Sequence, residues 1–210
     1  MGRSGDREIG EGRGGKKYFL PQHPTSPTPH QVVFMNLVFI GYRGAGKTTV
    51  GSRLAARLQM RFVDTDDLIE ERRGTPINNI VKSQGWDHFR RLEKSIIEEI
   101  SKGDHLIIAP GGGAVLDIDN VNALKRNGFI IWLKADQQAL LKRMGQDPVT
   151  YTRRPTLTGK GVLEELEEVM AYRDPYYERA ADFPFDTSIL DVESVMEGVL
   201  SILKENGVEG

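Results

Sequence analysis

The sequence predicts an α/β fold, in which a parallel β-sheet is covered by helices on both faces. Short apolar segments alternate with segments of helical periodicity along the chain, a pattern typical of parallel sheets. A glycine-rich loop lies between the first apolar segment and the first helical one. Further chemically suggestive stretches follow the second and third predicted strands, at the edge where ligands gather in such folds.

The composition limits the classes of protein to which the chain can belong. Its 210 residues suffice for one α/β domain with a substantial core. The formal net charge of −2 gives no support for a nucleic-acid-binding protein. The absence of cysteine excludes disulfides, thiolate metal sites and cysteine nucleophiles. No apolar run approaches the length of a membrane span. We therefore expect a cytoplasmic protein that binds neither nucleic acid nor membranes.

Residues 1–34 differ from the rest of the chain. They are rich in glycine and proline and show no hydrophobic period, so we expect a disordered N-terminal extension. A secretory signal would need an apolar segment, and a transit peptide would avoid the acidic residues found here. We expect the folded domain to span residues 35–210, with Met35 as its start or as the natural start of the protein.

The expected strands are short, apolar and rich in β-forming residues. In chain order they lie at residues 36–40, 61–64, 105–109, 129–133 and 183–186. The first reads Asn-Leu-Val-Phe-Ile and the fourth reads Phe-Ile-Ile-Trp-Leu. Such nearly continuous apolar runs are typical of strands that are buried on both faces. The third is ended by Pro110 and three glycines.

The expected helices alternate with these strands and carry apolar residues at helical spacing. In chain order they lie at residues 49–58, 67–73, about 86–102, 121–126, 137–144, 162 to about 181, and 192–203. In the first of them Val50, Leu54 and Leu58 repeat on one face. A polar, threonine-rich insert at residues 145–161 interrupts the alternation and is either a surface loop or a lid.

The loop Gly41–Thr48 reads Gly-Tyr-Arg-Gly-Ala-Gly-Lys-Thr and matches the P-loop pattern at every fixed position. Between a strand and a helix, such a loop directs backbone N–H groups and the positive end of the helix at a phosphate chain. Lys47 is expected to reach the β- and γ-phosphates, and Thr48 to hold Mg²⁺. The alternative is a glycine-rich turn with an exposed lysine. The expected nucleotide-binding residues are Gly44, Ala45, Gly46, Lys47, Thr48 and Thr49.

Two aspartates follow the second predicted strand. The third strand ends in Ala109-Pro110 rather than in an acidic residue, which makes Asp64 the candidate for the Mg²⁺ shell. Asp66 could bind or deprotonate an acceptor hydroxyl. Equally, both carboxylates could begin the following helix, where acidic residues are favoured.

Glycines and arginines supply the remaining candidates. Gly111-Gly112-Gly113 could present backbone N–H groups to ligand oxygens, or could form a turn that needs positive φ. Arg90 and Arg173 could bind an anion or pair with nearby acids, Arg90 with Glu93. Arg154, in the insert, could stabilise charge on a transferring phosphoryl group.

Taken together, these stretches resemble shikimate kinase in order and in spacing. They are Gly41–Thr48, Asp64-Thr-Asp66, Phe89-Arg90-Arg-Leu-Glu93, Gly111–Gly113, Arg154-Pro155 and Tyr172-Arg173-Asp-Pro-Tyr176. The resemblance implies a P-loop NTPase fold of the nucleoside monophosphate kinase type, with a five-stranded parallel sheet and a lid at about residues 145–161. It also implies transfer of the γ-phosphoryl group of ATP to the 3-hydroxyl of shikimate, on the route to chorismate and aromatic amino acids. We expect a monomer.

The resemblance assigns roles to individual residues. The catalytic residues would be Lys47, Asp66 and Arg154, the last also contacting ATP. Shikimate would be bound by Asp66, Arg90, Gly111, Gly112, Gly113 and Arg173, and Mg²⁺ by Thr48 and Asp64. Arg143 resembles the arginine near adenine at the base of the lid.

The chain departs from the family pattern at Pro110 and at Trp86-Asp87, where no role is assigned. Two alternatives to shikimate kinase are another small-molecule kinase, such as a gluconate kinase, and a non-catalytic ATP-binding relative. A GTPase is not expected, because its Asn-Lys-x-Asp motif is missing.

Overall fold

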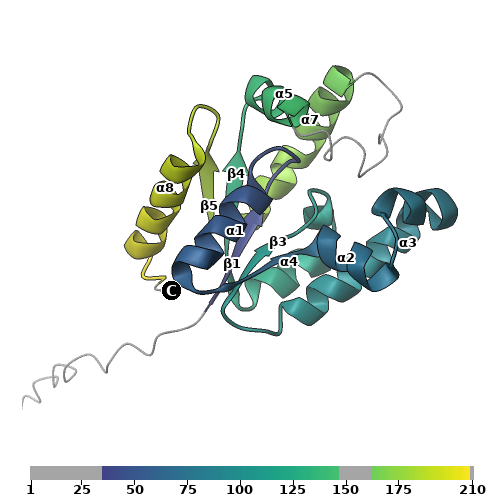
Figure 1. Ribbon diagram of the computed structural model, residues 1–210, viewed down its shortest axis with the longest axis horizontal. Helices are drawn as coiled ribbons and strands as arrows, with labels where there is room; N and C mark the ends of the chain where they lie inside the picture. Colours follow the sequence, from purple (N-terminus) through teal and green to yellow (C-terminus); the bar gives the residue numbers. More distant parts are fainter. Residues whose placement is uncertain (1–34, 147–161, 209–210) are drawn as a thin grey trace, which may run out of the picture. The chain divides into compact units, whose positions relative to one another are not determined.

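The described part of the chain is a parallel β-sheet between two layers of helices (Figure 1). The computed structural model describes residues 35–146 and 162–208. Five strands lie in the order β2-β3-β1-β4-β5, and every neighbouring pair is parallel. Their bounds are Asn36–Ile40 (β1), Arg61–Asp64 (β2), Leu106–Ala109 (β3), Gly128–Lys134 (β4) and Phe183–Asp186 (β5). The predicted fold class is confirmed.

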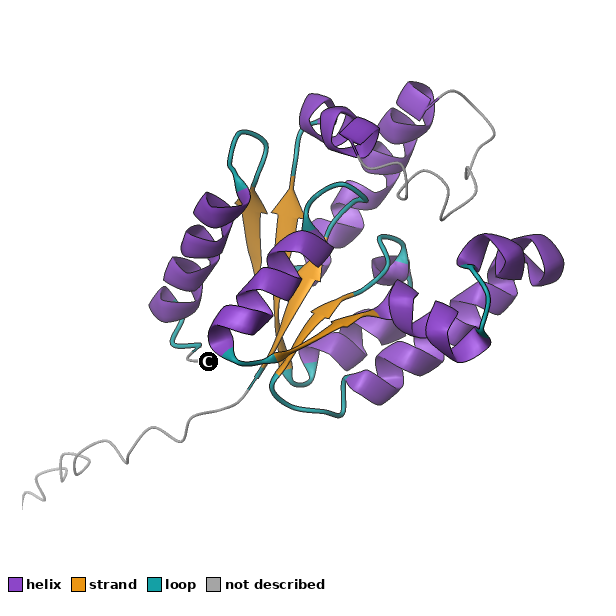
Figure 2. Ribbon diagram, viewed as in Figure 1, coloured by secondary structure: helices purple, strands orange, loops and turns teal. Residues whose placement is uncertain are grey.

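The helices cover both faces of the sheet, as Figure 2 shows. Their bounds are Lys47–Leu58 (α1), Thr65–Arg73 (α2), Ile77–Ile100 (α3), Ile118–Lys125 (α4), Gln137–Gln146 (α5), Val162–Ala180 (α7) and Val192–Glu205 (α8), with a 3₁₀ turn at Ala114–Leu116 (η1). Residues of α1 and α8 share one buried cluster, and residues of α3 and α4 share the other. Among the described helices, none is long and apolar enough to cross a membrane.

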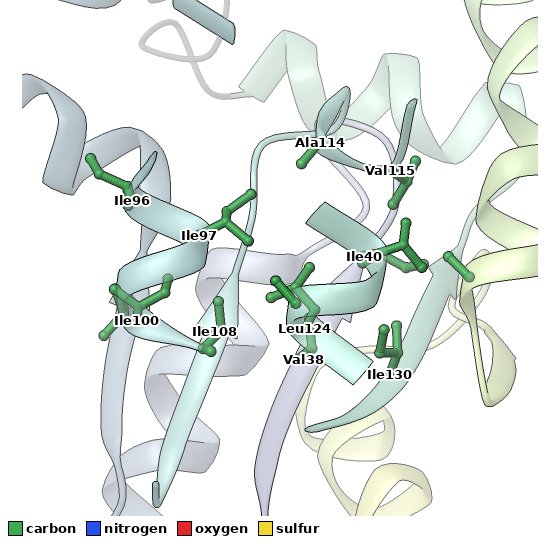
Figure 3. Close-up of a cluster of buried hydrophobic side chains, with 14 of the residues drawn as sticks. Val38, Ile40, Ile96, Ile97, Ile100, Ile108, Ala114, Val115, Leu124 and Ile130 are labelled. Atoms are coloured by element: carbon green, nitrogen blue, oxygen red, sulfur yellow. The ribbon is translucent and has the colours of Figure 1, made fainter. Parts of the chain in front are cut away.

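The central strand β1 contributes to both clusters. Leu37 and Phe39 belong to the cluster with α1 and α8. Val38 and Ile40 belong to the cluster with α3 and α4, which Figure 3 shows in close-up. This alternation follows from the strand geometry, in which successive side chains point to opposite faces. Both faces are therefore apolar, which explains why the strand reads as a continuous hydrophobic run.

The parallel register brings three loops to one edge of the sheet. β3 pairs with both β1 and β2, and Asp64 pairs with Ala109 at the last position of their strands. The loops that follow β1, β2 and β3 therefore leave from the same edge. This convergence was predicted from the sequence, and it is where open α/β sheets bind ligands.

The third helix begins earlier than predicted, at Ile77 rather than near residue 86. Its added turns end at Gly85, whose φ of 81° and ψ of 168° interrupt the helix before Trp86. Ile77 and Ile80 are fully buried, and the Ile77 N–H donates to the Glu70 side chain at 2.9 Å. Tertiary packing therefore holds a segment that local sequence signals separate from the rest of the helix.

Two predictions fall on residues that are not described. Residues 1–34, the expected disordered extension, lie outside the described residues. So do residues 147–161 of the expected lid, whereas Gly145 and Gln146 form the end of α5.

Candidate active site

The P-loop, Gly41–Thr48, connects β1 to α1 and requires glycine at defined positions. Gly41 has a φ of 142° and Gly46 a φ of 96°, which side chains disfavour. A Cβ at Gly41 would also lie 2.5 Å from the carbonyl oxygen of Leu133. Because α1 begins at Lys47, the positive end of its dipole faces the loop. This backbone suits an anionic ligand such as a phosphate chain.

Lys47 folds its side chain back over the P-loop. Its Nζ donates to the carbonyl oxygens of Gly41, at 2.9 Å, and Tyr42, at 3.1 Å. These bonds hold the ammonium group against the loop, beside the N-terminus of α1. A positive charge is thus placed where the loop would receive phosphates.

Asp64 connects the end of β2 to both α1 and α2. Its Oδ2 accepts a hydrogen bond from the Thr48 hydroxyl at 2.8 Å, and its Oδ1 accepts one from the Asp66 N–H at 2.9 Å. The carboxylate is therefore the N-cap of α2, which confirms the interpretation of Asp64 as a helix start, and it also lies beside Thr48. Its place in the Mg²⁺ shell stays a prediction. Burial, followed by the negative charge of Asp66, raises the pKa of Asp64.

Thr48 and Asp64 together offer two adjacent oxygen donors, the kind of ligand that Mg²⁺ prefers. Among residues 35–146 and 162–208, no three histidine, aspartate or glutamate side chains cluster as a metal site. A magnesium ion here would thus take further ligands from phosphate oxygens and water, as is usual for this ion. The raised pKa of Asp64 fits such an ion, because a nearby cation would offset the unfavourable charge.

The glycine turn, Gly111–Gly113, is anchored by two buried side chains. The Gly111 N–H donates to the Thr65 hydroxyl at 3.0 Å, and the Tyr177 hydroxyl donates to the Gly112 carbonyl at 2.6 Å. Burial raises the pKa of Tyr177 to about 12, so the hydroxyl keeps its proton at neutral pH. Sequence reasoning did not identify Tyr177. The available signal was its position one helical turn after Arg173.

None of the three glycines in this turn has a positive φ, so the interpretation as a turn that needs one is wrong. A Cβ at Gly113 would collide with the guanidinium of Arg90, and one at Gly112 would lie 3.5 Å from Nη1 of Arg173. Glycine at position 113 therefore leaves room for the Arg90 side chain, whereas the distance from Gly112 to Arg173 is an ordinary van der Waals contact.

Arg90 is held by a buried carboxylate and by aromatic rings. Its Nη1 donates to Oε2 of Glu93 at 2.5 Å, and Glu93 is fully buried. The guanidinium carbon lies 5.5 Å from the ring centroid of Trp86, within the range of a cation–π contact. The ion pair with Glu93 therefore forms, and the same guanidinium also lies against Gly113.

One cavity of about 500 Å³ extends from the P-loop to the glycine turn. Lys47, Asp66, Gly112 and Arg173 all line it. Arg90 and Gly113 do not line it, although Trp86, which contacts Arg90, does. Arg154 lies outside the described residues.

The opposite end of the cavity is lined by α5 and by the segment that joins β5 to α8. Nη1 of Arg143 donates to the Thr187 hydroxyl at 3.0 Å. The apolar lining residues at this end are Met144, Leu190, Val192 and Val195. An apolar slot beside an arginine suits a planar base. Sequence reasoning missed these apolar residues because they form no motif.

Comparisons with known proteins agree on one family. The family model described as shikimate kinase matches residues 43–204. A curated shikimate kinase of Symbiobacterium thermophilum is 40% identical over 177 residues, which cover 84% of this chain and 100% of the relative. Shikimate kinase 2 of Yersinia enterocolitica is 37% identical over 179 residues, which cover 85% of this chain and 99% of the relative.

Solved structures give the same result. The shikimate kinase of Acinetobacter baumannii in complex with shikimate aligns with a TM-score of 0.78 and 29% identity, covering 85% of this chain and 97% of that one. The shikimate kinase of Aquifex aeolicus aligns with a TM-score of 0.70 and 28% identity, covering 84% of this chain and 100% of that one.

The raised pKa of Asp64 predicts that removing its charge stabilises the ligand-free protein. Because the folded state disfavours the ionised form, this group lowers stability as the pH rises from its unfolded pKa to its folded pKa. Asparagine is an equally good N-cap. At neutral pH we expect Asp64→Asn to melt at a higher temperature than the wild type. This difference in melting temperature should vanish in acid, where Asp64 is protonated in both the folded and the unfolded state. Thermal unfolding without nucleotide at the two pH values measures it.

Asp191, the N-cap of α8, is the matched control. Its hydrogen bond from the Ser194 N–H, 2.8 Å long, lowers its pKa, so its ionised form stabilises the folded state at neutral pH. Asp191→Asn should lower the melting temperature at neutral pH, with a smaller effect in acid. A decrease of similar size for Asp64→Asn would contradict the prediction.

Proposed function

The chain belongs to the shikimate kinase family and is an ATP-dependent shikimate kinase, and we propose a role in this reaction for each site residue that the sequence predicted. The reaction transfers the γ-phosphoryl group of ATP to the 3-hydroxyl of shikimate. A single observation carries the assignment: Lys47, Asp66 and Arg173 line one cavity. A phosphate-binding loop, a carboxylate and an arginine suited to an acid are thus placed around one space.

At the ATP end, the backbone N–H groups of residues 44–49 bind the β- and γ-phosphates. Lys47 exchanges its bonds to loop carbonyls for bonds to these phosphates and neutralises part of their charge. Thr48 and Asp64 would hold Mg²⁺, which neutralises phosphate charge when it is bound. Arg143 lies beside the adenine ring.

At the shikimate end, Arg173 and Arg90 bind the carboxylate of the substrate. A guanidinium group offers a planar pair of N–H donors that matches a carboxylate better than an ammonium group does. The backbone of the glycine turn, Gly111–Gly113, contacts the ring hydroxyls. Glu93 and Trp86 hold Arg90 against the glycine turn, so that its guanidinium is oriented before shikimate arrives.

Asp66 binds the ring hydroxyls and directs the transfer. The 3-hydroxyl oxygen forms a bond to the γ-phosphorus while the bond from that phosphorus to the β–γ bridging oxygen breaks, and ADP leaves with this oxygen. Asp66 accepts the hydroxyl proton. Phosphoryl transfer of this kind depends mostly on positioning and on charge stabilisation. Arg154 would add positive charge at the γ-phosphoryl group, a role that depends on the resemblance alone.

A monomer in the cytoplasm is our proposal for the state and location of the enzyme. Gel filtration and fractionation of the native cells would test the two parts separately.

A coupled assay of ADP release tests the substrate assignment. Shikimate, gluconate and nucleoside monophosphates are compared in parallel under the same conditions. We expect turnover with shikimate alone: the curated relatives are shikimate kinases, and arginines that bind a carboxylate disfavour the nucleotides, although gluconate also carries this group. Turnover with gluconate or a nucleotide but not with shikimate would overturn the assignment.

In the same assay Asp66→Ala should lower kcat by about 10²–10⁴-fold, the usual weight of a positioned acid or base. ATP affinity should stay nearly unchanged, because the P-loop is intact. Asp67→Ala is the control, since Asp67 is adjacent but exposed and does not line the cavity. Near wild-type turnover of Asp66→Ala would remove Asp66 from its role.

Arg90→Lys should raise the KM for shikimate by about 10-fold, since one charge-assisted hydrogen bond of the fork is lost. The KM for ATP should not change. Arg91→Lys, at the exposed neighbouring position, should leave both constants unchanged. An unchanged KM for shikimate would exclude Arg90 from the binding site. The test is informative because Arg90 does not itself line the cavity.

A further inference from the structure

The P-loop is joined to α7 by an ion pair to which the roles above assign no function. Nη2 of Arg43, the third residue of the P-loop, lies 2.8 Å from Oε1 of Glu165 in α7. The Glu165 side chain is 1% exposed, whereas that of Arg43 is 24% exposed. Arg43 also lines the cavity. The pair therefore connects the wall of the cleft to a buried carboxylate.

The same helix contacts the cleft at two further places. Arg173 lines the cavity, and Tyr177 donates to the Gly112 carbonyl at 2.6 Å. Glu165, Arg173 and Tyr177 are all buried, and their spacing places them on one side of α7. One helix therefore contacts the P-loop through Glu165 and the glycine turn through Tyr177, and carries Arg173 between them.

The packing of α7 also links the two layers of the fold. Leu166 belongs to the buried cluster that contains Tyr42 and Ala45 of the P-loop. Tyr177 belongs to the other cluster, together with residues of α3 and α4. Because α7 is packed at both ends, it can hold the two parts of the cleft at a constant separation.

We propose that Glu165 is a positioning residue, which acts through Arg43 to set the position of the P-loop relative to the substrate-binding face of α7. The inference rests on the proposed function, in which ATP occupies the P-loop and shikimate contacts Arg173. An ion pair with a buried carboxylate suits this task, because Glu165 has lost its water and only a narrow range of geometries satisfies it. An exposed pair would allow the loop more freedom.

The kinetic consequence is specific. Transfer requires the γ-phosphoryl group and the 3-hydroxyl to be in line, and a misplacement of about 1 Å can cost on the order of 10²-fold in rate. The backbone of the P-loop and the guanidinium of Arg173 remain after the ion pair is removed, so each substrate can still bind. Loss of the pair should therefore lower kcat more than it raises either KM.

The test is a double-mutant cycle with Glu165→Gln, Arg43→Met and the double variant, assayed with ATP and shikimate. We expect each single variant to lower kcat by about 10–100-fold, with either KM changed less than about 3-fold. The double variant should lose no more than the worse single variant, because each single variant already breaks the contact between Arg43 and Glu165. Thermal unfolding is measured in parallel.

The ion pair between Arg57 and Glu197 is the matched control. It joins α1 to α8 at 2.5 Å, but its side chains are 43% and 56% exposed. Arg57→Met, Glu197→Gln and their double variant should keep wild-type kcat. Should either single variant of the buried pair fail to fold, the double variant, which leaves no unpaired charge at that site, decides the question.

The outcomes separate the inference from the function on which it rests. If the wild type does not phosphorylate shikimate, the proposed function fails. If the wild type is active and the Arg43 and Glu165 variants keep wild-type kcat with only a lower melting temperature, the pair is a structural contact and the inference is overturned. Multiplied losses of kcat in the double variant would also overturn it.

Discussion

The parallel register of β1, β3 and β2 is the constraint on which the cleft depends. It brings the P-loop, Asp64 and the glycine turn to one edge of the sheet. Two hydrogen bonds, from Thr48 to Asp64 at 2.8 Å and from Gly111 to Thr65 at 3.0 Å, then join neighbouring loops. A slip of one residue would turn every side chain of a strand to the opposite core and would separate these partners. Apolar packing on both faces of the sheet thus determines the geometry of a polar site.

The charges of the cleft are arranged around ligands that are themselves anionic. Arg43 and Arg90 each pair with a buried glutamate, which fixes the direction of the guanidinium but removes a carboxylate from water. The ionised Asp64 carboxylate lowers the stability of the folded state, because burial and the nearby Asp66 make its negative charge unfavourable. The buried carboxylates that organise the site therefore lower the stability of the fold. In the proposed function, phosphates, Mg²⁺ and an acidic substrate would complete the set of charges and offset this loss of stability.

Most of the fold was predictable because each strand is a local apolar run and each helix has its own period. The P-loop and the position of Asp64 after β2 were also visible in the sequence. The first turns of α3 were not, since Gly74-Thr-Pro76 and Gly85 indicate breaks there, and burial of Ile77 holds the segment. Tyr177 and Glu165 could not be predicted either. Their partners lie 65 residues away, in the glycine turn, and 122 residues away, in the P-loop, and no local pattern encodes such a distance.

The two glycine-rich segments of the cleft show why a motif needs a structure before its residues can be interpreted. In the P-loop, Gly41 and Gly46 adopt positive φ, so glycine is needed for the backbone itself. In the turn after β3, Gly113 has an ordinary φ of −100°, yet a side chain there would collide with Arg90. Glycine at this position therefore makes room for a side chain of α3. The sequence shows glycine in both segments. The structure shows that Gly113 is required by the position of Arg90 in α3, whereas Gly41 and Gly46 are required by their own backbone conformation.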